Sequence, residues 1–333
     1  MKTILLTLGD AAGIGPEVIV KCLAHVGPST SSGTISTPLH GPEIRPVVIG
    51  ELDILRDTAE SLNLQVRFAP ESEAAEGEIA VRSLGLLQQD DIDMGQLSAM
   101  CGNAAYHYFA HAVEECLAGN AHAIVTAPLN KEAMNHAGHR FMGHTDILET
   151  MTGVEGPVMA LWHPQIVVSH VTDHLPLRQA LRAITIQRIK RVVKLTWDVL
   201  RRANGKDPRI ALAGVNPHAG ENGLLGLEEI EILRPAMMDL KAEGYPTFGP
   251  YPGDTVFLQA LRGRFDAVIA MYHDQGFGPM KTLDFANGVN CTLGLPFVRT
   301  SPDHGTAFEI AGKGQAEPES MIAAWELAVK LLQ

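Results

Sequence analysis

Short, uniformly apolar segments recur along this 333-residue chain, and stretches with helical spacing separate them. Strands that are buried on both faces of a parallel sheet have this continuous apolar pattern, whereas half-exposed strands alternate. A strand is expected at residues 3–8, and helical periodicity is clear at residues 96–117 and 186–200. Strands that alternate with helices indicate an α/β protein with a mainly parallel, doubly wound sheet.

Three of the apolar segments lead into a polar turn that contains a histidine. In such sheets, ligands bind just beyond the carboxyl ends of the strands. Neutral histidine is the commonest metal ligand, and three imidazoles with an open position make a site that polarises a hydroxyl or carbonyl group. One histidine in a turn is more often structural, but three at strand ends together favour a metal site. Residues 166–168 precede His174, residues 210–215 precede His218, and residues 267–271 precede His273.

The length and charge of the chain limit its function. A chain of 333 residues exceeds the size at which a single hydrophobic core stops growing, so two domains are expected. The formal net charge of −12 argues against a nucleic-acid partner, because phosphate backbones bind to basic surfaces. No apolar run approaches about 20 residues, so no membrane span is expected. The four cysteines are far apart in the sequence and suit a reducing compartment, so we expect a cytoplasmic protein.

A glycine-rich turn at residues 9–16 follows the first predicted strand and precedes a helix. This is the right context for binding an anion at a helix N-terminus. However, Val18 stands where a dinucleotide-binding GxGxxG turn has its third glycine, so this fingerprint is not supported. A structural turn and a functional turn are equally compatible with the sequence. Residues 27–46 are rich in Ser, Thr, Pro and Gly, which predicts a flexible surface loop.

Further polar residues follow the third histidine, namely Lys281, Asn290 and Arg299. Such cations are usually solvated surface charges. Arg299, however, follows an apolar segment at residues 293–298, and an acidic protein that binds phosphate needs a donor such as the bidentate guanidinium. Residues 143–146 offer donors before a predicted helix, where they can cap the helix or hold an anion.

Taken together, these segments resemble the 4-hydroxythreonine-4-phosphate dehydrogenase family of vitamin B6 biosynthesis, essentially from end to end. One departure is Ala11, where the family usually has proline. The matching motifs are GDAAGIGPE at 9–17, TAPLNKEAM at 126–134, GHTDILE at 143–149, HLPLR at 174–178, NPHAGENG at 216–223, YHDQG at 272–276, VNCTLGLPFVRTSPDHGTA at 289–307 and IAGKG at 310–314. The resemblance implies two α/β/α domains with a cleft, as in isocitrate and isopropylmalate dehydrogenases. We expect residues 1–125 and 285–333 in the first domain and residues 126–284 in the second.

The same resemblance implies the site residues. It assigns one divalent metal ion (zinc, magnesium or cobalt) to the three histidines, in agreement with the strand-end argument, and it places the site at a homodimer interface with one histidine from the partner subunit. The implied substrate contacts are His144, Thr145, Lys281, Asn290 and Arg299. The expected contacts with NAD or NADP lie in a segment similar to the adenine-side loop of isocitrate and isopropylmalate dehydrogenases, and are His304, Gly305, Thr306, Ala307, Ala311 and Gly312.

The implied reaction is oxidation of 4-phosphooxy-L-threonine at C3 to 2-amino-3-oxo-4-phosphooxybutanoate. This acid then loses CO2 to give 3-amino-2-oxopropyl phosphate, in pyridoxal 5′-phosphate biosynthesis. Lys281 and Asp254 are the candidate proton-transfer residues, and a metal-bound water is the alternative base. Two other functions remain open: a related dehydrogenase of 4-phospho-D-threonate or 4-phospho-D-erythronate, and a metal- and phosphate-binding sensor without catalysis.

Overall fold

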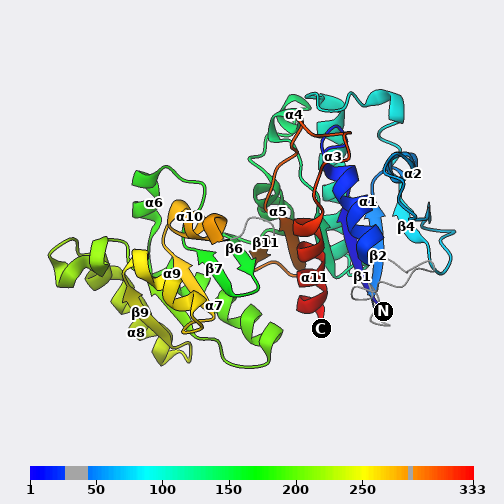
Figure 1. The fold of residues 1–333 in the computed structure, drawn as a ribbon. Helices are drawn as coiled ribbons and strands as arrows, with labels where there is room; N and C mark the ends of the chain where they lie inside the picture. Colours follow the sequence, from blue (N-terminus) through cyan, green and yellow to red (C-terminus); the bar gives the residue numbers. More distant parts are fainter. Residues whose placement is uncertain (27–43, 284–287) are drawn as a thin grey trace. The chain divides into compact units, whose positions relative to one another are not determined.

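The computed structural model describes residues 1–26, 44–283 and 288–333. These residues form two compact units, of which the first combines Met1–Gly156 with Leu295–Gln333 and the second is Pro157–Gly294 (Figure 1). Most of the loop predicted at residues 27–46 lies outside the described residues. Among the helices that the structure describes, none has the length and apolar character needed to cross a membrane.

The first unit contains a parallel sheet with strand order β3-β4-β2-β1-β5-β12. Its central strands are fully or almost fully buried, as their continuous apolar sequences predicted. The strands are β1 (Lys2–Thr7), β2 (Ile44–Ile49), β3 (Phe68–Pro70), β4 (Ile79–Arg82), β5 (Ala123–Thr126) and β12 (Val298–Pro302). The helices are α1 (Gly15–Val26), α2 (Leu52–Ser61), η1 (Gln89–Asp91), α3 (Ala99–Leu117), α4 (Lys131–His136), α5 (His144–Thr152) and α11 (Glu319–Leu332).

The second unit contains strands in the order β11-β6-β7-β10-β8-β9. The pairs β11/β6 and β6/β7 are antiparallel, and the remaining pairs are parallel. The strands are β6 (Val158–His163), β7 (Ile166–His170), β8 (Ile210–Ala213), β9 (Thr247–Tyr251), β10 (Ala267–Ala270) and β11 (Val289–Leu293). The helical segments are α6 (Leu177–Ala183), α7 (Ile186–Asn204), η2 (Pro217–Gly223), η3 (Glu229–Leu233), α8 (Arg234–Ala242), α9 (Gly253–Leu261) and α10 (His273–Leu283).

The limits of the two units differ from the expected 1–125 with 285–333 and 126–284, because α4 and α5 belong to the first unit and β11, which pairs with β6, belongs to the second. Helix α4 packs so closely on α3 that a Cβ atom at Gly102 would clash with the backbone of Ala133. The ring of Phe109 in α3 meets the ring of His144 in α5 edge to face, with centroids 4.6 Å apart. These contacts tie the segment after β5 to the first unit.

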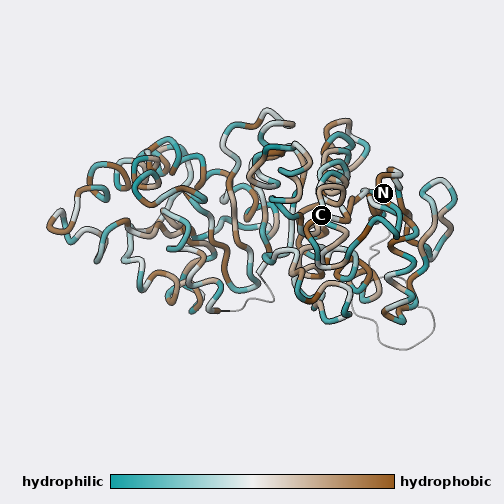
Figure 2. Tube along the Cα trace, turned by 90° about the horizontal axis from the view of Figure 1, so that it is seen from above, coloured by the Kyte–Doolittle hydropathy of each residue, from teal (hydrophilic) through white to brown (hydrophobic). Residues whose placement is uncertain are grey.

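The core of the second unit lies between its sheet and the helices α9 and α10. Val168, Ala211 and Val268 from the three parallel strands meet Phe257 of α9 and Phe277 of α10 in one buried cluster. Figure 2 shows apolar segments in brown alternating with polar segments in teal along the trace. This core fixes the strand ends from which the histidine-containing turns start.

Candidate active site

The three histidine-containing turns leave adjacent strands of the second unit. Strand β10 lies between β7 and β8 and is parallel to both, so their carboxyl ends share one edge of the sheet. His174 follows β7, His273 is the first residue of α10 after β10, and His218 lies in η2 after β8. The ring centroids of His174 and His273 are 5.3 Å apart. The arrangement of the strands therefore agrees with the geometric part of the prediction.

The ring of His273 is held from two sides. Its Nδ1 lies 2.7 Å from Oδ1 of Asp274, and since a carboxylate only accepts, Nδ1–H is the donor. The ring also stacks on Phe277, with centroids 4.1 Å apart. This hydrogen bond leaves the lone pair of Nε2 for a metal ion, which is the usual second-shell arrangement of a metal-binding histidine.

His170, at the end of β7, is a fourth histidine of this region, and it was not among the predicted site residues. Its side chain is buried, with its ring centroid 4.9 Å from that of Phe277 and 6.4 Å from that of His273. Burial lowers the pKa of His170 to about 4, so the ring is neutral. Its Nδ1 donates to the carbonyl of Met159 at 3.3 Å, and its Nε2 has no hydrogen-bond partner within the described ranges. The sequence offered no signal for it, because a histidine inside an apolar strand usually has a structural role.

His218 lies in a left-handed turn. Residues 218–222 all have positive φ, and four of them are not glycine: His218, Ala219, Glu221 and Asn222, with φ of 52°, 52°, 44° and 54°. Left-handed helical conformation costs most L-residues about 1–2 kcal/mol and asparagine less, so His218, Ala219 and Glu221 together store on the order of 3–6 kcal/mol. Strain of this size persists only where the surroundings hold the backbone in place, and it is concentrated at functional sites.

The donor atoms for the predicted metal ion are the imidazole nitrogens at the strand ends. Neutral imidazole nitrogens at neighbouring strand ends are suitable ligands for zinc or cobalt. Within the parts of the chain that the structure describes, however, no three His, Cys, Asp or Glu side chains come together to hold a metal ion. One chain thus brings His174 and His273 together, and the metal ligand set stays a prediction.

The other predicted residues of the second unit lie on neighbouring elements. Lys281, in the last turn of α10, has its Nζ 5.5 Å from the centroid of the Phe277 ring on which His273 stacks. Asn290 is in β11, and Asp254 is exposed in the first turn of α9. The proton-transfer roles of Lys281 and Asp254 stay predictions.

A second cluster of predicted residues lies in the first unit. Arg299 of β12 is buried and donates from Nη2 to Oγ1 of Thr126 at the end of β5, at 2.8 Å. His144 begins α5, and Thr145 follows it. Burial lowers the pKa of His144 well below its usual value, and the charges of Arg299 and Lys131 lower it further. A neutral imidazole beside a guanidinium is suited to donating or accepting a hydrogen bond with an anionic ligand.

Lys131 is a further candidate site residue, which no sequence pattern indicated although it lies in the quoted TAPLNKEAM motif. It is the first residue of α4, after the N-cap Asn130, whose side chain accepts from the backbone N–H of Ala133. A Cβ atom at Gly143 would lie 3.4 Å from Cε of Lys131. This short approach brings the lysine to the start of α5, where His144 and Thr145 lie.

The predicted cofactor segment, residues 304–314, packs on the glycine-rich turn. The backbone N–H of Ile14 donates to the carbonyl of Thr306 at 3.0 Å, and a Cβ atom at Gly13 would lie 2.8 Å from the same oxygen. Oε1 of the buried Glu17 accepts from the N–H of Gly312 at 2.6 Å. The glycine-rich turn therefore supports the segment from within the chain. The predicted contacts of this segment with NAD or NADP stay predictions.

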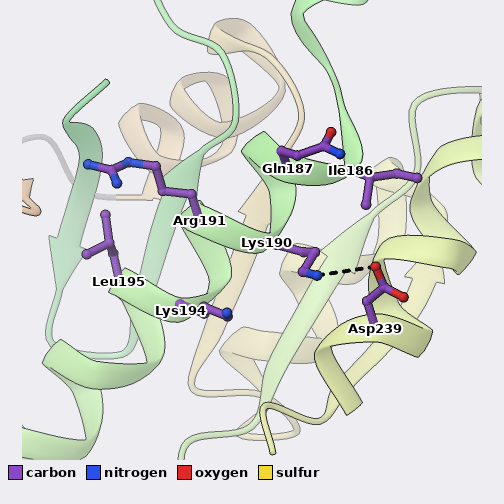
Figure 3. Close-up of a pocket in the computed structure, with 7 residues that line it drawn as sticks. All are labelled: Ile186, Gln187, Lys190, Arg191, Lys194, Leu195 and Asp239. Carbon is purple, nitrogen blue, oxygen red and sulfur yellow. Dashed lines mark hydrogen bonds and ion pairs between the residues drawn. The ribbon is translucent and has the colours of Figure 1, made fainter. Parts of the chain in front are cut away.

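A surface cavity between α7 and α8 is a separate feature that is lined in part by cationic side chains (Figure 3). Lys190 and Lys194 line it, but their charges are already matched by carboxylates. Nζ of Lys190 lies 3.2 Å from Asp239 and 2.7 Å from Glu243, and Nζ of Lys194 lies 2.6 Å from Glu243. This pairing already matches the charges of the two lysines without an anion.

The fold places the chain in a known structural class. The structure of isocitrate dehydrogenase from Methylococcus capsulatus matches it with a TM-score of 0.50 at 14% identity, covering 100% of this chain and 86% of that one. At this level of identity, the likeness concerns the fold alone. It agrees with the expected isocitrate/isopropylmalate dehydrogenase-like architecture.

The family follows from closer similarities. Residues 43–328 match the family described as pyridoxal phosphate biosynthetic protein PdxA, and the chain belongs to this family. It is 46% identical to D-threonate 4-phosphate dehydrogenase of Salmonella typhimurium, over 99% of both chains. It is 38% identical to 4-hydroxythreonine-4-phosphate dehydrogenase of Geobacter metallireducens, over 98% of this chain and 95% of that one. The crystal structure of 4-hydroxythreonine-4-phosphate dehydrogenase from Klebsiella pneumoniae matches with a TM-score of 0.86 at 43% identity, covering 100% and 98%.

Proposed function

We propose that this protein is a metal-dependent dehydrogenase that uses NAD or NADP to oxidise the C3 hydroxyl of a 4-phosphorylated four-carbon acid. The observation that carries the proposal is the position of His174, His218 and His273 at the ends of three adjacent parallel strands, in a chain similar over almost its full length to dehydrogenases of such acids. Both of these relatives are named for substrates that carry a phosphate on C4.

Each proposed role follows from the chemistry of the side chain. Arg299, Lys131 and Lys281 are cations suited to the carboxylate and phosphate of the substrate. The neutral His144 donates or accepts a hydrogen bond without adding charge. His174, His218 and His273 hold the metal ion, which when bound supplies Lewis-acid chemistry that lowers the pKa of an alcohol and stabilises negative charge on oxygen.

The reaction balances as one oxidation and one decarboxylation. The hydride on C3 passes to the nicotinamide ring, and the hydroxyl proton goes to a base, for which Lys281 is the candidate in this chain. The resulting 3-oxo acid loses its carboxylate as CO2 and takes up a proton at C2. From D-threonate 4-phosphate this sequence gives glycerone phosphate, and from 4-phosphooxy-L-threonine it gives 3-amino-2-oxopropyl phosphate.

D-threonate 4-phosphate is the substrate that we favour, because the relative with 46% identity carries that name, whereas the relative named for 4-hydroxythreonine 4-phosphate is 38% identical. The name of the structure from Klebsiella pneumoniae, at 43% identity, supports the amino acid as the second candidate. The two substrates differ at C2, which carries a hydroxyl in one and an amino group in the other.

The active form that we propose is a homodimer formed by the second unit. This unit exposes large apolar side chains around η2, α8 and β9, among them Leu224, which is 79% exposed, and Met238, which is 73% exposed. Contiguous exposed apolar side chains mark interaction surfaces. A partner chain that contributes a histidine would complete a set of three ligands, of which one chain brings His174 and His273 together.

A metal-dependent assay of NADH formation tests the proposal. Enzyme freed of metal with a chelator is assayed with zinc, magnesium or cobalt on 4-phosphorylated D-threonate, D-erythronate and 4-hydroxy-L-threonine, and CO2 is measured in parallel. We expect turnover only with metal, with the highest kcat/KM for D-threonate 4-phosphate. His218→Ala abolishes turnover, whereas the matched control His136→Ala, an exposed histidine in α4, retains it. Unchanged turnover in His218→Ala refutes the metal role, and NAD binding without any hydride transfer favours the non-catalytic sensor.

A further inference from the structure

Glu229 is a buried carboxylate that none of the predicted roles uses. It is the first residue of the π-helical segment η3, and only 1% of its surface is exposed. Its Oε1 accepts from the backbone N–H groups of Val215 and Asn216, both at 2.8 Å, and its Oε2 accepts from Nδ2 of Asn216 at 2.9 Å. Both oxygens therefore bind the short segment that joins β8 to the turn containing His218.

The left-handed turn also closes around this carboxylate. A Cβ atom at Gly220 would lie 2.6 Å from Oε2 of Glu229, and one at Gly214 would lie 3.1 Å from Oε1. Gly220 has a φ of 78°, so glycine is required there both by space and by conformation. Residues on both sides of His218 are thus packed against one buried charge.

Gln275 connects the same segment to the neighbouring histidine-containing strand. Its Nε2 donates to the carbonyl of Gly214 at 2.6 Å, and its Oε1 accepts from the N–H of Met271 at 2.6 Å. Met271 directly follows β10 and lies two residues before His273. The backbone leading to His218 is therefore fixed both to η3 and to the strand end that leads to His273.

We propose that Glu229 is a positioning residue that holds residues 218–222 in their left-handed conformation and thereby sets the place of the His218 imidazole. The inference rests on the proposed metal role of His218. Four non-glycine residues in this conformation need a compensating interaction, and a carboxylate that accepts three N–H bonds supplies it. Replacement of a residue that orients a metal ligand commonly weakens metal binding by about 10–100-fold.

The test compares Glu229→Gln with Glu231→Gln. Glutamine keeps the size of the side chain. One carboxylate oxygen is replaced by an NH2 group, which cannot accept the hydrogen bond that Val215 or Asn216 donates. Glu231 is an exposed residue of the same π-helical segment, so its replacement matches the change in charge. Two readouts are used: hydrogen exchange of the backbone amides of residues 215–222 in the metal-free enzyme, and binding of Co²⁺ alone, followed by its absorption spectrum.

In Glu229→Gln, we expect loss of protection in residues 215–222 and Co²⁺ binding weakened by at least about tenfold. Glu231→Gln is expected to behave like the wild type in both measurements. Unchanged exchange in Glu229→Gln overturns the inference. Protection lost throughout the second unit also overturns it, because Glu229 then supports the whole fold rather than the turn.

A rescue experiment separates local strain from general damage. Glycine adopts positive φ without steric cost, so Glu221→Gly combined with Asn222→Gly lowers the strain that Glu229 balances. We expect this pair, added to Glu229→Gln, to restore part of the exchange protection, and no recovery contradicts the inference. The His218→Ala variant keeps the two proposals distinguishable: if it binds Co²⁺ like the wild type, the metal role fails, while the exchange measurements still decide the role of Glu229.

Discussion

Gly276 and His170 provide a prediction whose size follows from their packing. A Cβ atom at Gly276 would clash with Nε2 of His170 and would lie 2.9 Å from Cγ1 of Val168. His170 is 1% exposed and is anchored by its bond to the carbonyl of Met159, so it has little room to move. Gly276→Ala must therefore displace the imidazole or shift the start of α10.

The energy of this change can be built from three contributions. Overpacking a core costs about 1–3 kcal/mol, and losing the hydrogen bond from His170 costs about 1 kcal/mol. Alanine is favoured over glycine in a helix by about 1 kcal/mol. We expect Gly276→Ala to lower the free energy of unfolding by about 1–3 kcal/mol. His170→Ala alone leaves a cavity and should cost about 2–4 kcal/mol.

The free energy of unfolding of the double variant decides whether the two residues interact. In His170→Ala/Gly276→Ala, the new methyl group occupies part of the space that the imidazole leaves, so the two costs should not add. We expect the double variant to be more stable than additivity predicts by about 1–3 kcal/mol. In a Trp325→Phe background, which removes the tryptophan of the first unit, urea unfolding followed by fluorescence of Trp162 and Trp197 in the second unit gives the four free energies. Additivity to within about 0.5 kcal/mol refutes the reasoning, because residues without contact show that behaviour.

Three further predictions concern the two units separately. Arg299→Lys removes the guanidinium group that donates to Thr126 Oγ1. It should raise KM for the phosphorylated substrate about tenfold or more while the melting temperature changes little. An unchanged KM in steady-state kinetics contradicts the proposed contact between Arg299 and the substrate. Burial raises the pKa of Asp10 from 3.8 to about 6, so the folded state binds a proton more tightly than the unfolded state. The free energy of unfolding therefore falls by up to about 3 kcal/mol as pH rises from about 4 to 7. Asp10→Asn should remove this part of the pH dependence in urea titrations at several pH values, and an unaltered profile excludes the assignment. Leu224→Asp should convert the proposed dimer into monomers in sedimentation experiments, whereas a persistent dimer places the interface elsewhere.

The arrangement of the strands could be predicted because it depends on local patterns. A run such as residues 267–271 has no polar position, and this indicates a strand that is covered on both faces. Parallel strands direct their carboxyl ends to one edge, so the approximate positions of His174, His218 and His273 followed from order along the chain alone. The antiparallel pairs of β6 did not follow from such patterns, since β6 and β7 are separated by only two residues and form a hairpin.

The supporting residues could not be predicted for a different reason. Lys131, His170 and Glu229 act through contacts with residues that are distant along the chain or on another element, and no local pattern encodes these contacts. Even the quoted motif that contains Lys131 gave no reason to separate that lysine from a solvated surface charge. The limits of the units were displaced for the same reason, since the packing of α4 and α5 on α3 is a tertiary contact.

The turn containing His218 has a backbone conformation that its sequence motif does not predict. In NPHAGENG, the residue types indicate a turn, and its glycines and Asn222 are the residues that tolerate positive φ. Yet His218, Ala219, Glu221 and Asn222 share that conformation, which the local sequence disfavours. A conformation that local preference opposes has to be held by tertiary contacts, and the buried carboxylate thirteen residues after Asn216 is the group that makes them. The predicted metal ligand is thus visible in the sequence, whereas the residue that binds the backbone before its turn lies outside the motif.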